Sequence, residues 1–297
     1  MKHIHFILNP IAGKGNNSLD LAILNKYFNK DNYNFVIKPT CYKKHAIVLT
    51  KESINEQADI IVACGGDGTI NEVASCLVNS TIPLGIIPIG SGNGLASNLN
   101  IPKNIEKALE LIKIQYTKQI DVGKLNQNYF FSNTGIGFDA QVIKNYEASN
   151  ERNITSYIKA TIKSLKTVNS KLTEVETTLN DMTFQHKPFL IFISNSNEMG
   201  YHLSLTPKAS LDDGKLDILI VPKLSGFKIV LFTLLMFIKR HNILKEVKTY
   251  QTKNVKISKE KPIFQVQIDG EFLIIKNRNI DISILERALS VICLATI

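Results

Sequence analysis

The sequence lacks the features that mark membrane-spanning, secreted and zinc-binding proteins. It contains no uncharged apolar run of about 18 residues or more, so no membrane-spanning helix is predicted. Its first segment, 1–10, reads as a strand and a turn, without the apolar length or cleavage site of a signal peptide. The four cysteines form no CxxC pair. They are expected to be reduced and buried in a cytosolic protein, and zinc binding has almost no support.

Two common nucleotide-binding motifs are also missing. No GxxxxGK[ST] loop occurs in the chain, and no GxGxxG follows the first expected strand. Both absences argue against an ordinary P-loop enzyme and against a dinucleotide-dependent dehydrogenase. The first arginine of the chain is Arg152. Any cationic support for a phosphate in the first half must therefore come from Lys14, a metal ion or backbone amides.

The composition indicates a packed globular protein with a basic surface. The 297 residues are comfortable for two domains, and 44% of them are hydrophobic. The formal net charge of +9 suits a nucleic acid, an anionic membrane or a nucleotide as partner. A lysine-rich chain that is also full of asparagine and isoleucine equally fits a base bias in its gene.

The central feature of the sequence is a glycine-rich turn at 64–69. An apolar run of strand length at 59–63 precedes it, and a helical pattern starts at Ile70. Glycines let the backbone approach a ligand closely, and a helix start supplies unpaired N–H groups for a phosphate. Asp67 is the unusual member of this turn, because a carboxylate repels a phosphate unless a metal bridges them or it handles a proton.

The first half alternates expected strands with expected helices. The strands are at 3–8, 34–38, 59–63 and 83–89, and the helices are at 19–28, 45–57 and 105–114, with another that begins at Leu95. This alternation predicts a parallel sheet covered on both faces. Glycine-bearing loops at 9–15, 64–69 and 90–94 each follow a strand, so they are expected to gather at one edge. A nucleotide site at that edge is the prediction.

The second half reads mainly as strands. They are expected at 122–126, 129–133, 175–179, 188–194, 216–221, 254–258, 263–268 and 272–276, with one main helix at 156–168. A further apolar segment, 226–238, is too short to span a bilayer and ends in Lys239-Arg240-His241. It is either a helix at the membrane interface or a helix packed on the sheets.

Seven motifs occur in the order in which one enzyme family has them. They are NPIAGKG at 9–15, Thr40 followed by His45-Ala46, GGDGTINEV at 65–73, GSGN at 90–93, GIGFDA at 135–140, PKASLDDGKLD at 207–217 and DGE at 269–271. In these motifs the chain resembles the bacterial diacylglycerol kinase and lipid kinase family, which includes sphingosine and ceramide kinases. GGDGT alone is shared with NAD kinases, whereas the continuation into Asn71-Glu72 and the late DDG and DGE runs resemble lipid kinases.

The resemblance implies a fold of class α/β plus β. It consists of an N-terminal doubly wound α/β nucleotide-binding domain, 1–125, and a C-terminal β-sandwich-like domain, 126–297. The active site is expected in the cleft between them. Whether the last residues pack back on the first domain is left open.

The resemblance also implies which residues bind the nucleotide. They are Asn9, Thr40, Gly65, Gly66, Asp67, Gly68, Thr69, Ile70, Asn71, Ser91 and Asn93. Asp67 would lie beside the triphosphate, help to hold Mg²⁺ and orient the acceptor hydroxyl; the alternative is that it caps the following helix. Ser91 stands where the family more often has threonine. Gly94 stands where many bacterial members have an acidic residue. The segment GSGNGLA at 90–96 is therefore more similar to sphingosine-kinase-like members.

Two acidic turns in the second half carry the remaining roles that the resemblance implies. Glu271 resembles the catalytic base that takes the proton of the lipid hydroxyl, although DGE alone is a plain hairpin turn. Ser210, Asp213 and Lys215 resemble the family's Mg²⁺ loop, with a side-chain oxygen from Asp213 and backbone carbonyls from the other two; Asp-Asp-Gly alone is a turn. Asp121 and Asp139, expected at strand ends, either join this charge network or are carboxylates at the core rim.

The function expected from these residues is an ATP-dependent, Mg²⁺-requiring kinase that acts on a hydroxyl of a membrane lipid. Diacylglycerol, phosphatidylglycerol, a sphingoid base or a ceramide each fit as acceptor. The expected partners are ATP, the lipid and an anionic membrane surface, with no nucleic acid; a homodimer is left open. The protein is expected to be cytoplasmic and transiently membrane-associated. The alternatives are a metabolite kinase in the manner of NAD kinases and a catalytically silent lipid-binding protein.

Overall fold

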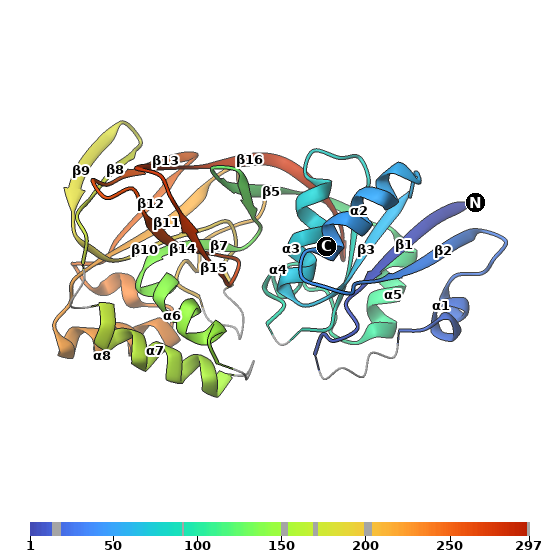
Figure 1. The fold of residues 1–297 in the computed structure, drawn as a ribbon, viewed down its shortest axis with the longest axis horizontal. Helices are drawn as coiled ribbons and strands as arrows, with labels where there is room; N and C mark the ends of the chain where they lie inside the picture. Colours follow the sequence, from blue (N-terminus) through green and yellow to red (C-terminus); the bar gives the residue numbers. More distant parts are fainter. Residues whose placement is uncertain (14–18, 91, 150–153, 169–171, 199–203, 296–297) are drawn as a thin grey trace. The chain divides into compact units, whose positions relative to one another are not determined.

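The computed structural model describes residues 1–13, 19–90, 92–149, 154–168, 172–198 and 204–295 (Figure 1). The chain forms two compact units. Unit 1 comprises Met1–Ile120 and Glu286–Ile297, and unit 2 comprises Asp121–Leu285. The chain leaves unit 1 within strand β5 (Thr117–Leu125) and returns within strand β16 (Asn279–Ile292). The end of the chain therefore belongs to unit 1.

Unit 1 is the doubly wound α/β domain that the sequence predicts. Its parallel strands lie in the order β2-β1-β3-β4, and the end of β16 pairs beside β4. The strands are β1 (Lys2–Leu8), β2 (Tyr33–Pro39), β3 (Ile60–Gly65) and β4 (Leu84–Pro88). Every residue of β3 and β4 is buried, as expected for strands covered on both faces.

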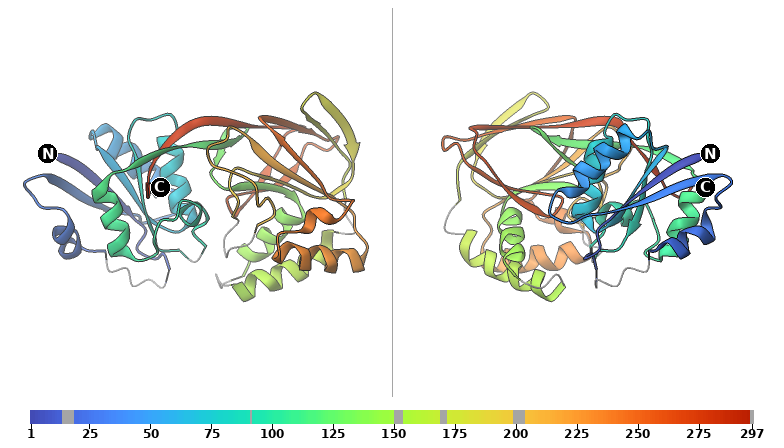
Figure 2. Two further views of the ribbon diagram at one scale, coloured as in Figure 1. Left: turned by 180° about the vertical axis from the view of Figure 1, so that it is seen from behind. Right: turned by 45° about the vertical axis from the view of Figure 1, so that its right-hand side comes forward.

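Helices cover both faces of this sheet (Figures 1 and 2). They are α1 (Leu21–Tyr27), α2 (His45–Asn55), α3 (Asp67–Leu77), α4 (Gly94–Asn98) and α5 (Ile105–Ile114). Helices α1 and α5 pack on one face through a core cluster that includes Leu24, Phe6 and Ile112. Helix α2 ends before the expected residue 57, because Gln57 takes a left-handed conformation with φ of 59°.

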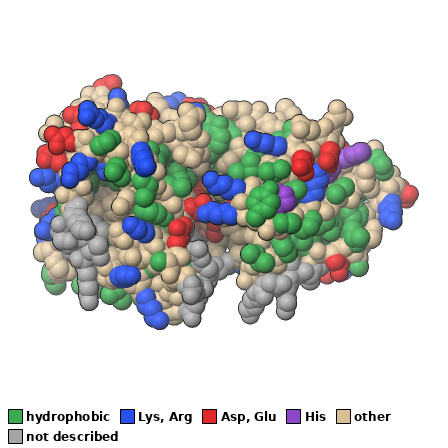
Figure 3. Space-filling model, in the orientation of Figure 1, with side chains coloured by type: hydrophobic (Ala, Val, Ile, Leu, Met, Phe, Trp, Pro, Cys, Tyr) green, Lys and Arg blue, Asp and Glu red, His purple; other side chains and the backbone are tan. Residues whose placement is uncertain are grey.

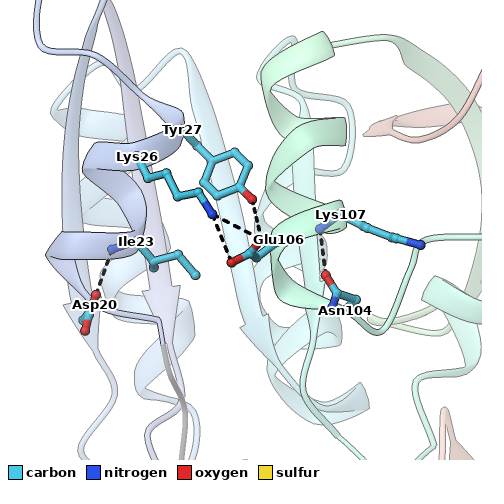
Figure 4. Close-up of polar contacts among 7 residues, drawn as sticks. All are labelled: Asp20, Ile23, Lys26, Tyr27, Asn104, Glu106 and Lys107. Atoms are coloured by element: carbon cyan, nitrogen blue, oxygen red, sulfur yellow. Dashed lines mark hydrogen bonds and ion pairs between the residues drawn. The ribbon is translucent and has the colours of Figure 1, made fainter.

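Side chains at the surface hold α1 and α5 together (Figure 4). The Glu106 carboxylate accepts a hydrogen bond of 2.9 Å from the Tyr27 hydroxyl and pairs with the Lys26 ammonium at 3.3 Å. Asp20 and Asn104 cap the two helices by accepting N–H groups of their first turns. These exposed contacts set the helix register, while the buried cluster beneath supplies most of the stability.

Unit 2 is the predicted β-sandwich-like domain. One of its sheets has the order β12-β11-β10-β7-β14-β15, and in the other β13 pairs with both β8 and β16, and β8 with β9. The bounds are β6 (Asn128–Phe130), β7 (Asn133–Gly137), β8 (Val175–Leu179), β9 (Met182–His186), β10 (Pro188–Ser194), β11 (Leu216–Pro222), β12 (Lys248–Thr252), β13 (Asn254–Ser258), β14 (Phe264–Ile268) and β15 (Glu271–Ile275). Alternate residues of β10 and β11, such as Ile191 and Ile218, fill the core between the sheets.

Three helices cover the other face of the six-stranded sheet (Figure 1). They are α6 (Phe138–Glu147), α7 (Ile154–Val168) and α8 (Gly226–Phe237). The remaining alternate residues of β10 and β11, including Phe192 and Leu219, form a second cluster with side chains of these helices. No helix among the described residues is long and apolar enough to cross a membrane.

The prediction of a single strand at 129–133 is wrong. Strand β6 ends at Phe130 and β7 begins at Asn133. The chain bends between them because the N–H groups of Phe131 and Ser132 point at the carboxylate of Asp269 instead of a neighbouring strand. Helix α6 and strands β9, β12 and β16 are not predicted from the sequence.

Candidate active site

The structure brings the loops after β1, β3 and β4 together at the carboxyl edge of the unit 1 sheet. The Asn9 amide donates to the Thr69 hydroxyl at 3.1 Å, which joins the first loop to the second. The second and third loops touch through their backbones, since a Cβ added to Gly66 would lie 3.3 Å from the Cα of Gly90. Glycine at these positions therefore permits the close approach of the two loops.

Asp67 locks the second loop to the third. One carboxylate oxygen accepts the N–H of Asn93 at 2.8 Å, and the other accepts the N–H of Gly94 at 2.7 Å. Burial raises the pKa of this carboxyl, and these backbone hydrogen bonds counteract the rise. Asp67 thus accepts amides at the start of α4, and it is a brace between loops more than a cap on its own helix α3.

The first turn of α3 presents backbone amides at this edge. Its N-cap residue is Gly66, and no side chain caps the helix. The first hydrogen bond of the helix runs from the Ile70 N–H to the Gly66 carbonyl, so the amides of Gly68 and Thr69 have no partner within the helix. Such amides, at the positive end of a helix of 11 residues, are suited to an anion such as a phosphate.

The other residues predicted to bind the nucleotide do not all lie at this edge of the sheet. Thr40 follows β2, and its N–H donates to the Leu8 carbonyl at 2.8 Å, which places it at the same edge. Asn71 lies on α3, where its side-chain oxygen accepts the Ser75 hydroxyl at 3.3 Å. Ser91 lies outside the described residues.

Glu72 has a role that sequence reasoning missed. Its carboxylate accepts the N–H of Lys44 at 3.0 Å and so satisfies an amide at the N-terminus of α2. Lys44 is the N-cap residue of that helix, in a left-handed conformation and without a side-chain cap. Glu72, which extends the glycine motif, therefore anchors the neighbouring helix.

In unit 2, Glu271 is the first residue of β15, directly after a tight turn. Asp269 and Gly270 form the turn with positive φ values of 46° and 82°, the geometry of a two-residue hairpin. The Asp269 carboxylate accepts the N–H groups of Phe131, Ser132 and Asn133 at 2.8, 2.8 and 3.0 Å. The first carboxylate of the DGE run is thus a clamp, and the half-buried Glu271 is held at a defined position beside it.

Removing this clamp should release the turn. We expect Asp269→Ala to lower the free energy of unfolding by about 3 kcal/mol, because three amides lose a charged acceptor. Urea unfolding measures this effect. Asp181→Ala is a matched control, since Asp181 also has a positive φ in the hairpin turn between β8 and β9. A loss no larger than that of the control would contradict the clamp.

A buried polar network lies behind the Glu271 turn. Gln267 accepts the N–H of Gly270 at 2.9 Å and donates to the Asn133 side chain at 2.7 Å. Asp139 lies in the first turn of α6, and not at a strand end as expected, and one of its carboxylate oxygens has no hydrogen-bond partner in the described part of the chain. Burial raises the pKa of Asp139 to about 6, and a hydrogen bond with Gln267 only partly offsets this.

Asp139 should make stability depend on pH. Its folded pKa lies above that of an unfolded aspartate, so the folded state binds the extra proton and the free energy of unfolding falls as pH rises from about 4 to about 6. This rise in the pKa of Asp139 corresponds to a loss of roughly 3 kcal/mol in the free energy of unfolding at high pH. We expect Asp139→Asn to be more stable than the wild type at pH 8, with the difference shrinking towards pH 4. Urea unfolding across this range tests it, and equal pH dependence of both proteins would refute it.

The Ser210–Lys215 turn is anchored on a buried carboxylate. Asp121, in β5, accepts the N–H of Gly214 at 2.7 Å. The Asp213 carboxylate is exposed, accepts the N–H of Lys215 at 3.0 Å and makes no ion pair with a described residue. Ser210 donates its hydroxyl to Asp212 at 2.6 Å. Among the described residues no three His, Cys, Asp or Glu side chains form a metal site, so a cation at this turn would depend on Asp213 and backbone carbonyls.

Both units match known families. Residues 3–125 match the diacylglycerol kinase catalytic domain, and residues 132–293 match the YegS C-terminal NAD kinase beta sandwich-like domain. A diacylglycerol kinase of Bacillus subtilis is 27% identical over 277 residues, which cover 92% of this chain and 90% of that protein. A diacylglycerol kinase of Staphylococcus aureus is 28% identical over 275 residues, or 91% and 86% of the two chains.

Solved structures show the same architecture. A crystal structure of a diacylglycerol kinase from Bacillus anthracis has a TM-score of 0.78 and 25% identity, covering 99% of this chain and 97% of that one. The yeast NADH kinase complexed with NADH has a TM-score of 0.55 at 9% identity, covering 100% and 84%, and shows the likeness of fold alone. An α/β unit followed by a β-sandwich-like unit is thus the fold that this chain shares with these structures. By its two family matches, this chain belongs to the bacterial diacylglycerol kinase and lipid kinase family.

Proposed function

We propose that this protein transfers the γ-phosphoryl group of ATP to a hydroxyl group of a membrane lipid, with a diacylglycerol-type acceptor as the leading substrate class. The observation that carries the proposal is the pair of braced loops in a chain of the lipid kinase family. In unit 1, Asp67 holds together the glycine loops, and in unit 2 Asp269 clamps the turn that presents Glu271. The reaction requires both units. It would take place at the surface of an anionic membrane.

The nucleotide would bind at the loop edge of unit 1. Its phosphates would accept the amides of Gly68 and Thr69 at the start of α3, while Asn9 keeps the Thr69 hydroxyl oriented. Asn93, whose side-chain oxygen is buried without a hydrogen-bond partner among the described residues, lies where a nucleotide group can complete its hydrogen bonding. Thr40, Asn71 and Ser91 are proposed as further contacts. This part of the site would position the phosphates through backbone amides and not through cationic side chains, because its neighbouring strands carry no arginine.

The donor set of the Ser210–Lys215 turn fits Mg²⁺. Asp213 offers a carboxylate that forms no ion pair with a described residue. Burial, and after it the negative charge of Asp213, raises the pKa of the neighbouring Asp217. Asp213 and the backbone carbonyls of Ser210 and Lys215 would hold the cation. When bound, Mg²⁺ would offset negative charge that aspartates and phosphates bring to this region.

Glu271 would serve as the general base. Its carboxylate accepts the proton of the lipid hydroxyl while the hydroxyl oxygen forms a bond to the γ-phosphorus of ATP. The bond between this phosphorus and the bridging oxygen breaks, and ADP leaves with its electron pair. The Asp269 clamp and the hydrogen bond that the Gly270 N–H donates to Gln267 keep Glu271 in a fixed position for this step.

Radiolabelled ATP tests the proposal directly. The purified full chain is incubated with Mg²⁺ and, in separate reactions, with diacylglycerol, phosphatidylglycerol, sphingosine, ceramide and NAD. We expect label in diacylglycerol above the other acceptors. Label in NAD and in no lipid would establish the metabolite kinase instead. Mass spectrometry of lipid that co-purifies with the protein, together with no transfer to any acceptor, would establish a silent lipid-binding protein.

A further inference from the structure

Helix α8 has apolar side chains on two opposite faces. One face, with Ile229, Phe232 and Met236, packs on the cluster that covers the six-stranded sheet. The other face carries Phe227, Val230, Leu234 and Ile238 at spacings of three, four and four residues, and these side chains are 59–79% exposed. Single exposed apolar residues are ordinary, but a stripe at helical spacing on a helix that is already anchored indicates a second partner.

Helix α7 repeats this pattern on the same side of the sheet. It contributes Leu165 to the same cluster, while Ile158 and Ile162 are 51% and 54% exposed. Lys159 and Lys163 follow these isoleucines directly and are exposed as well. Both helices cover one face of the six-stranded sheet (Figures 1 and 2), and each carries exposed apolar side chains.

The two segments that carry the stripes hold basic residues and no acidic ones. Neither α7 nor the stretch from Ile218 to Lys245 contains an aspartate or glutamate. That stretch carries Lys223, Lys228, Lys239, Arg240 and Lys245, of which only Lys228 forms an ion pair with a described residue, Glu246. Basic side chains and no acidic ones are visible over α7 in Figure 3.

We propose that the α7–α8 surface, defined by the exposed apolar residues of both helices and their flanking basic residues, is the face by which this protein docks on an anionic lipid bilayer. Apolar side chains would enter the headgroup region while Lys239 and Arg240, at the end of α8, contact lipid phosphates. This rests on the proposed function in one respect, since a lipid kinase must meet its acceptor at a bilayer. A second copy of the chain suits the surface less well, because two identical basic surfaces would repel each other.

Sedimentation with vesicles tests this docking surface in the full chain. We expect Phe227→Glu/Leu234→Glu to lower binding to phosphatidylglycerol vesicles at least tenfold. The matched control is Ile114→Glu/Met182→Glu, which places the same charges at residues that are 68% and 49% exposed elsewhere; its binding should stay within twofold of the wild type. Lys239→Gln/Arg240→Gln should weaken binding and reduce its dependence on salt. Phosphatidylcholine vesicles should bind the wild type weakly.

Two results would overturn the docking surface. One is vesicle binding by Phe227→Glu/Leu234→Glu at the level of the control variant. The other is a wild-type dimer in analytical ultracentrifugation that this variant converts to a monomer without loss of vesicle binding. Activity on a short-chain, water-dispersed diacylglycerol should be the same in the variant and the wild type. Failure of the proposed function would abolish that activity in both proteins, and vesicle binding would still be measurable.

Discussion

Glu271→Gln should lower the turnover number of lipid phosphorylation by about 1,000-fold, within the range observed for loss of a general base. Glutamine keeps the shape of the side chain but cannot accept the proton of the hydroxyl. The turn itself should persist, because Asp269 and Gln267 hold it through bonds that do not involve Glu271. ATP affinity and the urea midpoint should therefore match those of the wild type. The measurement is initial rates across a range of ATP and diacylglycerol concentrations.

The split between turnover and affinity separates a base from a structural residue. Loss of a base lowers the turnover number and leaves the KM for ATP unchanged, whereas a structural role would change both. Glu260→Gln removes the same charge from an exposed turn of unit 2 and should leave the rate unchanged. If Glu271→Gln retains a third or more of the wild-type rate, Glu271 is not the base.

The architecture of unit 1 could be predicted because its signals are local. The residues of β3 form an uninterrupted apolar run, and glycines follow it at once. A run of this kind has few alternatives to a buried strand, and parallel strands necessarily bring their carboxyl ends to one edge. The meeting of Asn9 with Thr69 follows from that topology, although the two residues are far apart in the sequence.

The partners of the acidic residues could not be predicted, because they depend on tertiary structure. Nothing in the sequence near Asp269 indicates that its carboxylate accepts three amides from the bend before β7. The same bond pattern explains why a continuous strand at 129–133 was a reasonable but wrong prediction. Asp67 shows the same limit: from the sequence its alternatives are a metal contact and a helix cap, and the structure shows it bonded to the next loop.

Helix α8 shows a different limit of sequence analysis. Its composition permits either a helix at the membrane interface or a helix packed on the sheets. From the sequence, these two interpretations stand as alternatives. The structure shows one apolar face packed, through Phe232, and another exposed, through Phe227 and Leu234. A helix that is apolar all round can satisfy both interpretations, and only the packed neighbours decide which side chains stay free.

Asp67→Asn should lower kcat/KM for ATP at least 100-fold and the free energy of unfolding by about 2 kcal/mol. Both carboxylate oxygens now accept an amide, at 2.8 Å from Asn93 and 2.7 Å from Gly94. An asparagine places an NH₂ group against one of these donors, so one bond is lost and two donors face each other. The second and third loops should separate, and the edge that would bind the phosphates loses its shape. Steady-state rates and urea unfolding measure the two effects.

A matched control distinguishes the brace from a general loss of stability. Asp59 also accepts a backbone N–H, that of His3 at 2.7 Å, and it lies just before the opposite end of the same strand β3. Asp59→Asn should therefore reduce stability without changing the rate with ATP. Nucleotide affinity measured in EDTA separates the brace from metal binding: if Asp67 holds the loops, Asp67→Asn weakens nucleotide binding about tenfold even when no divalent cation is present. Unchanged affinity in EDTA, with activity lost only in Mg²⁺, would assign Asp67 to the metal and contradict the brace.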